Sequence, residues 1–306
     1  MRIQTIHTKH LRWIDVVNPG PEELAWLKAG YKFHKLHFQA AAKAQLRPHL
    51  DVADAYNFLV LLFPVYDRET QEIFAGEVDF FIGDKFLVTI HYGQIETLKS
   101  FFEQVRTDPT ARGEIMPKGA GFLLYKILEV LFQRSYPILD HVNEDVAVIE
   151  SKIFRDADVD MLSRLLLLKK NIIEVRKMMK THNFVIEQLG NSKKSYMTFT
   201  GSKVYYRDLV ESSHNIWDIL EALKETVDTL AETSQSLASH RLNQITKMIS
   251  IMSAIVIPAT LTAFIFAVDV PGIPFQDHPH GFWIVAILMA LSSLSMLAFF
   301  KAKKWF

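Results

Sequence analysis

The residues best suited to chemistry form a polar stripe within an apolar stretch near the C-terminus. Asn243, Thr246, Ser250, Ser253 and Thr260 follow one another at steps of three, four, three and seven residues. Such steps place side chains on roughly one face of an α-helix. Lipid offers these groups no hydrogen-bond partners, so the stripe indicates either a water-filled path or helix packing through small polar residues.

Bulky apolar residues and one acid extend this stripe. Ile249, Ile257 and Phe264 would form apolar constrictions along such a path, so the predicted lining includes them. The segment Ala267-Val268-Asp269 stands at the outer end, where a carboxylate would attract cations. We therefore predict this segment as the site of ion entry and selectivity.

Two further groups of side chains could hold a cation. A possible outer-mouth metal site consists of Asp277, His278 and His280, because imidazole and carboxylate suit Zn²⁺ or a similar ion. Polar residues in a short turn are equally expected without any metal. A possible cytoplasmic metal site between subunits consists of Asp156, Asp158 and Asp160. These acids also fit a turn and N-cap for the helix expected from Met161.

Composition excludes several other functions. The chain has 306 residues, with 34 basic and 34 acidic side chains and no cysteine. Zero net charge argues against nucleic-acid binding, and the lack of cysteine excludes thiolate chemistry, disulfides and iron–sulfur clusters. The glycine-rich motifs that bind dinucleotides or ATP are missing. No pairing of a nucleophile with a base is evident, so we do not expect an enzyme.

Two uncharged stretches are long enough to cross a bilayer as helices. They span residues 248–268 and 282–300, separated by an outer loop of residues 269–281 that lacks Lys and Arg. Arg241 and Lys247 precede the first stretch, and a basic tail of residues 301–306 follows the second. The positive-inside rule then places both termini in the cytoplasm. The expected location is the inner (plasma) membrane, as a multi-pass protein.

The first 247 residues are expected to form a cytoplasmic α/β domain and a helical part. Residues 1–120 alternate between strand-like and helical patterns, with strands predicted at 13–17 and in three segments between 56 and 92. Gly83-Asp84 is a hairpin signal between the last two of these. Residues 121–247 read as a helical bundle and a stalk helix, because residues 202–257 contain neither Gly nor Pro. Apolar residues at heptad spacing from Leu209 to Leu237 predict a packed seam on this stalk.

Several motifs together resemble those of the CorA/ZntB superfamily of two-span divalent-cation transporters. They are Tyr205-Tyr206-Arg207-Asp208, Arg241-Leu242-Asn243 with Lys247, Ile257-Pro258-Ala259-Thr260-Leu261, Trp283 and the terminal Lys303-Lys304-Trp305-Phe306. Upstream, Arg47-Pro48-His49-Leu50 and the segments NFLVLLFPVY and FLVTIHYG are similar to the family's cytoplasmic domain. The resemblance implies a homopentameric funnel, with the long helix lining a pore and the second span outside it.

The sequence departs from this family at the outer end of the first span. The family hallmark there is Gly-x-Asn, whereas this chain reads Ala267-Val268-Asp269. A ring of aspartates would carry up to five negative charges, some neutralised because like charges raise each other's pKa. Phe264 stands where the family has a small glycine, and a ring of phenylalanines could narrow or dewet the path.

The resemblance and the stripe together predict a divalent metal cation channel or transporter for Mg²⁺, Zn²⁺ or related ions. An ion gradient and the membrane potential would drive it, and no cofactor is expected beyond the transported or regulatory cation. The expected partners are further copies of the chain, membrane lipids and divalent cations, with no nucleic acid. The alternative is a CorA-like membrane scaffold or regulatory protein that keeps the fold without transport.

Overall fold

The computed structural model describes residues 2–43, 47–153, 159–268, 273–274 and 278–303. The chain divides into two compact units, Met1–Glu232 and Thr233–Phe306. The finer division predicted above, at residues 120 and 247, stays a prediction.

A six-stranded mixed sheet forms the centre of the first unit. Its strands are β1 (Ile3–His7), β2 (Arg12–Val17), β3 (His49–Val52), β4 (Tyr56–Tyr66), β5 (Ile73–Gly83) and β6 (Phe86–His91). The order is β1-β2-β6-β5-β4-β3, and every neighbouring pair is antiparallel except β2 and β6. The α/β class predicted from the sequence is therefore confirmed.

The hairpin between β5 and β6 shows why its glycine is required. Gly83 pairs with Phe86, so Asp84 and Lys85 form the two-residue turn, one position later than the sequence signal suggested. A Cβ atom on Gly83 would lie 2.3 Å from the Phe86 ring. The missing side chain thus lets the aromatic ring pack across the end of β5.

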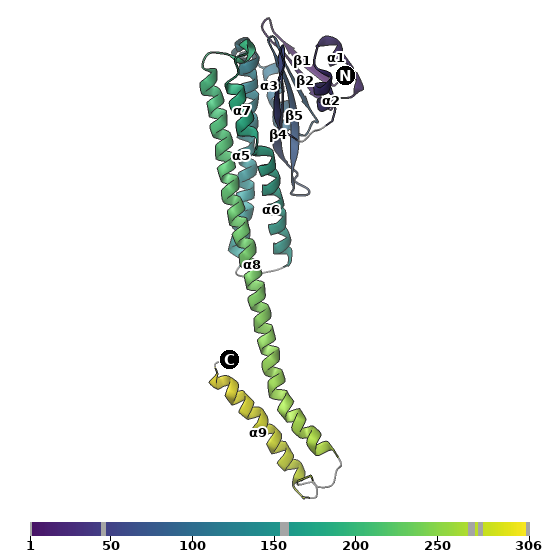
Figure 1. Ribbon diagram of the computed structural model, residues 1–306, viewed down its shortest axis with the longest axis vertical. Helices are drawn as coiled ribbons and strands as arrows, with labels where there is room; N and C mark the ends of the chain where they lie inside the picture. Colours follow the sequence, from purple (N-terminus) through teal and green to yellow (C-terminus); the bar gives the residue numbers. More distant parts are fainter. Residues whose placement is uncertain (1, 44–46, 154–158, 269–272, 275–277, 304–306) are drawn as a thin grey trace. The chain divides into compact units, whose positions relative to one another are not determined.

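Helices cover both faces of the sheet (Figure 1). On one face, α1 (Pro21–Gly30) and α2 (Lys35–Ala41) contribute Leu27 and Ala41 to a core with Phe58, Phe81 and Val88. On the other face lie α5 (Ala120–Lys152), α6 (Val159–Met179) and α7 (His182–Gly190). The result is a three-layer arrangement in which the sheet is buried on both sides.

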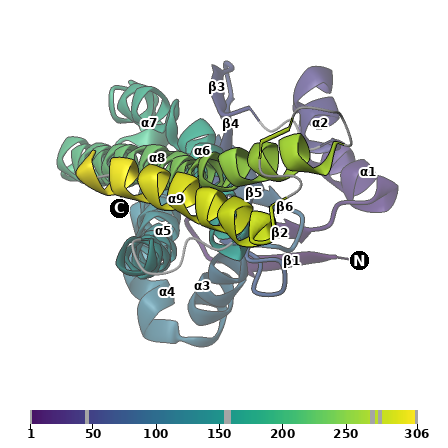
Figure 2. The same cartoon turned by 90° about the horizontal axis from the view of Figure 1, so that it is seen from below.

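Short elements close the end of the helical layer. The helices α3 (Glu96–Thr107) and α4 (Pro109–Ile115) lie beside the start of α5, as Figure 2 shows, and the short 3-10 helices η1 (Met116–Lys118) and η2 (Ser195–Met197) flank it. At Gly121 the backbone of Met197 approaches so closely that a Cβ would lie 2.7 Å from its carbonyl oxygen. The buried Tyr206 hydroxyl donates to the Gly121 carbonyl over 3.0 Å.

The longest helix, α8 (Ser202–Ala267), begins in the first unit and continues into the second. Its predicted seam is buried from Leu209 to Leu230, with Leu209, Ile216, Leu220 and Val227 no more than 1% exposed, and only partly buried at Leu237. The seam packs within the chain, because Lys169 of α6 forms an ion pair of 2.7 Å with Asp228 and Tyr136 of α5 donates to the Ser212 carbonyl. Its heptad spacing therefore reports packing against neighbouring helices of the same chain.

The second unit consists of the rest of α8 and α9 (Gly281–Ala302). Both helices include a segment long and apolar enough to cross a membrane. Within this unit α9 runs alongside the C-terminal part of α8 (Figures 1 and 2), and the Ser293 hydroxyl donates to the Ile255 carbonyl over 3.3 Å. The expected helical hairpin of two apolar helices is thus present.

Candidate functional site

The eight residues predicted to line a path lie on α8, and the chain leaves all of them exposed. From residue 241 to residue 250 the helix is exposed on every side, whereas from Ile251 onward one side is covered and the predicted lining lies on the other. Ile249, Ile257 and Phe264 are 59%, 61% and 68% exposed. The polar members are exposed as well: Asn243, Thr246, Ser250, Ser253 and Thr260. The eight residues therefore lie on one helix, and no other part of the chain buries them.

The partner helix α9 covers a different stripe of α8. Ile251 is 5% exposed, and the other members of this covered stripe are partly buried: Ala254, Ile255, Pro258, Ala259 and Thr262. With 3.6 residues per turn, the centre of the covered stripe lies about 180° around the helix from the centre of the predicted lining. The hairpin contact thus uses the back of α8 and leaves the polar stripe free.

Oxygen atoms are available along this helix. The Thr260 hydroxyl donates to the Val256 carbonyl over 2.6 Å, which leaves lone pairs of its oxygen for another partner. Pro258 has no N–H and leaves the carbonyl of Ala254 without its helical donor, but both residues belong to the side covered by α9, so this oxygen is not part of the stripe. Hydroxyl and carbonyl oxygens are the groups that replace water around a hard cation.

The outer end of the stripe is described only in part. Ala267 is the last residue of α8, and Val268 is 52% exposed. Asp269 and Asp277 lie outside the described residues. His278 and His280 are exposed with ring centroids 5.9 Å apart, and the backbone N–H of His280 donates to His278 Nδ1.

The predicted cytoplasmic metal site lies largely outside the described residues. Asp156 and Asp158 lie outside the described residues, and Asp160 is described only as part of the α6 backbone. Within the described parts of the chain, no three His, Asp or Glu side chains converge as a metal site would need.

The histidines in the first unit have structural partners. His37 contacts the Tyr56 hydroxyl through Nδ1 at 2.8 Å and an oxygen of Asp51 through Nε2 at 3.2 Å. Burial lowers the pKa of His37, although the nearby Asp51 opposes that shift. The Nδ1 atom of His34 accepts the backbone N–H of Leu36 and caps α2. Both rings are therefore engaged without a metal.

One group of residues is not signalled by the sequence at all. Arg68 follows β4, Arg134 lies in the middle of α5, and both line one cavity of the first unit. They are far apart in the chain, and no periodicity or motif connects them. Only the packing of α5 against the end of β4 brings them together.

Known proteins place the chain in a family. The family model described as CorA-like Mg2+ transporter protein matches residues 8–303, so the chain belongs to this family. The resemblance inferred from the motifs is confirmed.

Individual relatives extend over most of the chain. YfjQ of Bacillus subtilis is 28% identical, with 96% of this chain and 89% of that protein covered. The cobalt/magnesium transport protein CorA of Thermotoga maritima is 23% identical over 90% of this chain and 77% of its own. The complete structure of the CorA magnesium transporter from Methanocaldococcus jannaschii superposes with a TM-score of 0.85 at 21% identity, covering 98% of this chain and 94% of that one. This structural likeness confirms the predicted fold: an N-terminal α/β domain, a long helix and two apolar C-terminal helices.

Proposed function

We propose that this chain is a divalent metal cation channel or transporter of the inner (plasma) membrane, acting on Mg²⁺, Zn²⁺ or a related ion. Membership of the CorA-like family and the two apolar helices support this. The observation that carries the proposal is the polar stripe of α8, which faces away from α9 and is left unburied by the chain. Polar groups on a lipid-facing surface would be costly, so the stripe needs a polar surround.

That surround requires several copies of the chain. Two spans cannot enclose a water-filled path, whereas identical copies of one helix around a closed symmetry axis can. We propose a homopentamer in which the stripe of each α8 faces the axis and α9 lies outside. Membrane lipids would then contact α9 and the remaining apolar surface. Native mass spectrometry of the detergent-purified protein tests the number of copies.

The proposed mechanism has one role for each kind of residue. Asp269 attracts the cation at the outer mouth, and Ala267 and Val268 complete that entry. Thr260, Ser253, Ser250, Thr246 and Asn243 replace lost water as the ion descends. Phe264, Ile257 and Ile249 form the apolar constrictions. A divalent ion gains about 4–5 kcal/mol per 100 mV of inward-negative potential, so the potential alone can drive entry.

The remaining assignments follow from this mechanism. Both termini lie in the cytoplasm, and the divalent ion is the cargo, so no resident cofactor and no enzymatic reaction are proposed. The groups at Asp277, His278 and His280, and at Asp156, Asp158 and Asp160, are proposed as accessory cation sites. Metal binding to variants that lack one or the other group of three side chains, measured by fluorescence quenching or by calorimetry, tests these sites separately from ion flux.

The lining is tested most sharply by two threonines of α8. Thr260 lies on the stripe and Thr262 on the side covered by α9, and each donates its hydroxyl to the carbonyl four residues earlier. In proteoliposomes, we expect Thr260→Val to reduce divalent flux about tenfold, the effect of losing about 1.4 kcal/mol of ion coordination. Thr262→Val should leave the flux nearly unchanged. Equal effects of the two substitutions would show that the stripe is not the lining.

The entry residue is tested by Asp269→Asn and Asp269→Ala in the same assay. Asn keeps the oxygen ligand without the charge and should retain part of the flux, whereas Ala should lose most of it. If the wild type and both variants all fail to carry Mg²⁺, Zn²⁺, Co²⁺ and Ni²⁺, the proposed transport is wrong.

The second candidate function is a CorA-like membrane scaffold or regulatory protein without transport. Phe264 favours it, because a large exposed ring on the stripe could close the path when copies assemble. The flux of the wild type separates the two candidates, because a transporter carries divalent ions and a closed scaffold carries none. Phe264→Ala then tests the role of the ring, since a path closed by Phe264 alone should begin to conduct when the ring is removed.

A further inference from the structure

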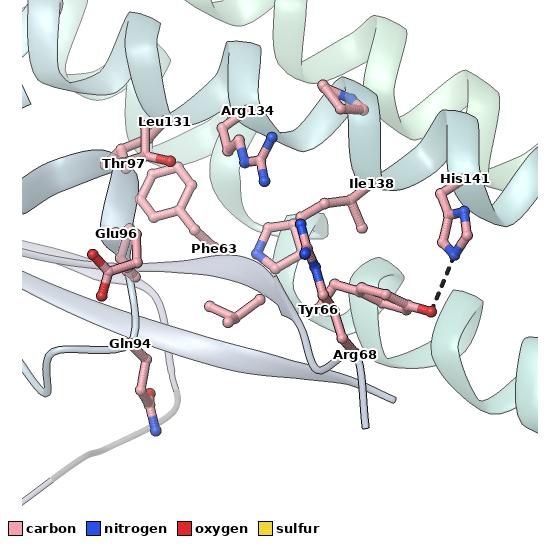
Figure 3. Close-up of a pocket in the computed structure, with 14 residues that line it drawn as sticks. Phe63, Tyr66, Arg68, Gln94, Glu96, Thr97, Leu131, Arg134, Ile138 and His141 are labelled. Atoms are coloured by element: carbon pink, nitrogen blue, oxygen red, sulfur yellow. Dashed lines mark hydrogen bonds between the residues drawn. The ribbon is translucent and has the colours of Figure 1, made fainter. Parts of the chain in front are cut away.

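A cavity of about 440 Å³ lies in the first unit, between the end of β4, the start of α3 and the middle of α5. Figure 3 shows the side chains that line it. Phe63 and Tyr66 come from β4, and Arg134, Ile138 and His141 come from successive turns of α5. Arg68 enters from the connection between β4 and β5. Neither the proposed ion path nor the metal sites involve this cavity.

The cavity carries two positive charges that the protein does not neutralise. Figure 3 shows the side chains of Arg68 and Arg134 reaching into the same space from opposite walls. Neither guanidinium forms a salt bridge or a side-chain hydrogen bond with any residue that the structure describes. Other arginines of the same unit are paired, as Arg106 is with Glu103 and Arg176 with Glu221.

Glu96 is the one acid among the residues that line the cavity, and it has a partner of its own. Its Oε1 atom is 2.6 Å from Nζ of Lys99 on the next turn of α3. At the other end, His141 Nε2 contacts Tyr66 Oη at 3.0 Å and lies 3.8 Å from Asp145. Two arginines therefore face one acid in the lining, and neither arginine forms a salt bridge with a described residue, so the cavity favours an anion.

The rest of the lining suits a flat apolar group. Phe63, Leu131 and Ile138 are buried and form the apolar floor of the cavity. Contact with His141, whose ring centroid is 5.0 Å away, fixes the Tyr66 ring at the edge. Tyr66 therefore offers a fixed aromatic wall near the two charges. A volume of about 440 Å³ falls in the range of small-molecule sites and exceeds what a single inorganic anion needs.

We propose that this cavity binds a nucleoside phosphate, with Arg68 and Arg134 on the phosphates and the nucleobase against Tyr66. The planar guanidinium fork matches phosphate oxygens, and an unpaired arginine has no competing partner to release. This site would use side chains from β4 and α5 and no glycine-rich loop, which explains why no nucleotide motif is visible in the sequence.

The test is calorimetric titration of the full chain in detergent micelles with ATP, in EDTA and without divalent ions so that metal binding does not contribute. We expect saturable 1:1 binding per chain. Arg68→Gln and Arg134→Gln should each weaken it at least tenfold, and the double substitution should abolish it. Arg106→Gln, a surface arginine of α3 outside the cavity, is the matched control and should bind as the wild type does.

A second titration, with inorganic tripolyphosphate, tests whether the nucleobase contributes to binding. The phosphate chain alone should bind at least tenfold more weakly than ATP, and Tyr66→Leu should reduce that difference. Equal binding of ATP and tripolyphosphate would overturn the nucleoside part of the proposal. A lack of ATP binding at millimolar concentration, or binding unaffected by both arginine substitutions, would overturn the site. None of these outcomes depends on ion flux, so they stand apart from the test of transport.

Discussion

The two units of this protein bury their side chains in opposite ways. In the first unit a sheet is covered on both faces, and residues such as Trp13, Phe58 and Ile216 have no exposed surface. In the second unit only Ile251 and Phe300, among its described residues, are buried. The first unit therefore carries its own core, whereas the second leaves most of its apolar side chains unburied by the chain, as the proposed assembly in a membrane requires.

The largest expected effect comes from separating the two units. A chain ending at Glu232 keeps the first unit and loses the exposed apolar helices, so it should be soluble and unfold cooperatively. The full chain should sediment with membranes. A shorter chain ending at Gly201 loses the buried Leu209, Ile216 and Leu220 and should aggregate. Fractionation and circular dichroism check these outcomes, and insolubility of residues 1–232 would contradict the comparison.

The next largest effect should come from the close backbone contact at Gly121. Gly121→Ala places a Cβ 2.7 Å from the Met197 carbonyl oxygen, and a backbone atom cannot move aside cheaply. We expect a loss of about 3 kcal/mol in the free energy of unfolding. Gly113→Ala is the control, because a Cβ there meets nothing within 4 Å and alanine is the better helix former. It should stabilise by about 0.5–1 kcal/mol, measured by denaturant unfolding.

A smaller, pH-dependent effect is expected at His182. The ring is fully buried between Phe63 and Phe132, and this burial lowers the pKa of His182 to about 3. In the unfolded chain the imidazole of His182 binds a proton near pH 6.5, whereas in the folded chain it stays neutral down to about pH 3. The free energy of unfolding therefore falls as the pH drops from about 6.5 toward 3. The slope contributed by this residue approaches about 1.4 kcal/mol per pH unit.

His182→Leu should remove that slope from the free energy of unfolding. His10→Gln, at an exposed position, should leave it in place. Denaturant unfolding at pH 7, 6 and 5 distinguishes the two variants. If His182→Leu loses stability with acid as steeply as the wild type, the buried ring is not the cause.

The smallest expected effect lies in the second unit, where the helices share few contacts. Ser293→Ala removes the hydroxyl that donates to the Ile255 carbonyl across the hairpin. Hydrogen bonds between membrane helices contribute about 0.6 kcal/mol on average, so we expect a loss of that size. Ser295→Ala is the control, since its hydroxyl donates to Ser292 on its own helix. Unfolding in mixed micelles measures both, and a loss above about 2 kcal/mol would mean that the hairpin is held more strongly than its contacts indicate.

The sequence predicts best those features whose signal is local. The two apolar helices, the seam of α8 and the β5–β6 hairpin all follow from spacing or composition. The strands β1 and β3 have no clear signal in the sequence, because edge strands bury few side chains and show little alternation. The parallel pairing of β2 with β6 also has no signal in the sequence, since it depends on which strands, far apart in the chain, become neighbours in the sheet.

The candidate site divides in the same way. The polar stripe is a property of one helix, so its periodicity in the sequence suffices to identify it. Its position opposite the face that contacts α9 depends on packing between two helices and required the structure. The cavity of Arg68 and Arg134 depends on tertiary packing alone, so no motif or periodicity in the sequence predicts it.

The polar stripe and the covered stripe leave further surfaces of α8 that belong to neither. Between the polar stripe and the face covered by α9 lie two flanking arcs, represented by Met252 and Val256 on one side and Leu261 and Ile265 on the other. These arcs carry aliphatic side chains in the apolar part of the helix. In the proposed pentamer, substitutions on these arcs would change the contacts between copies and spare both the proposed lining and the hairpin. Under that proposal, assembly preference and ion preference can diverge independently within one helix.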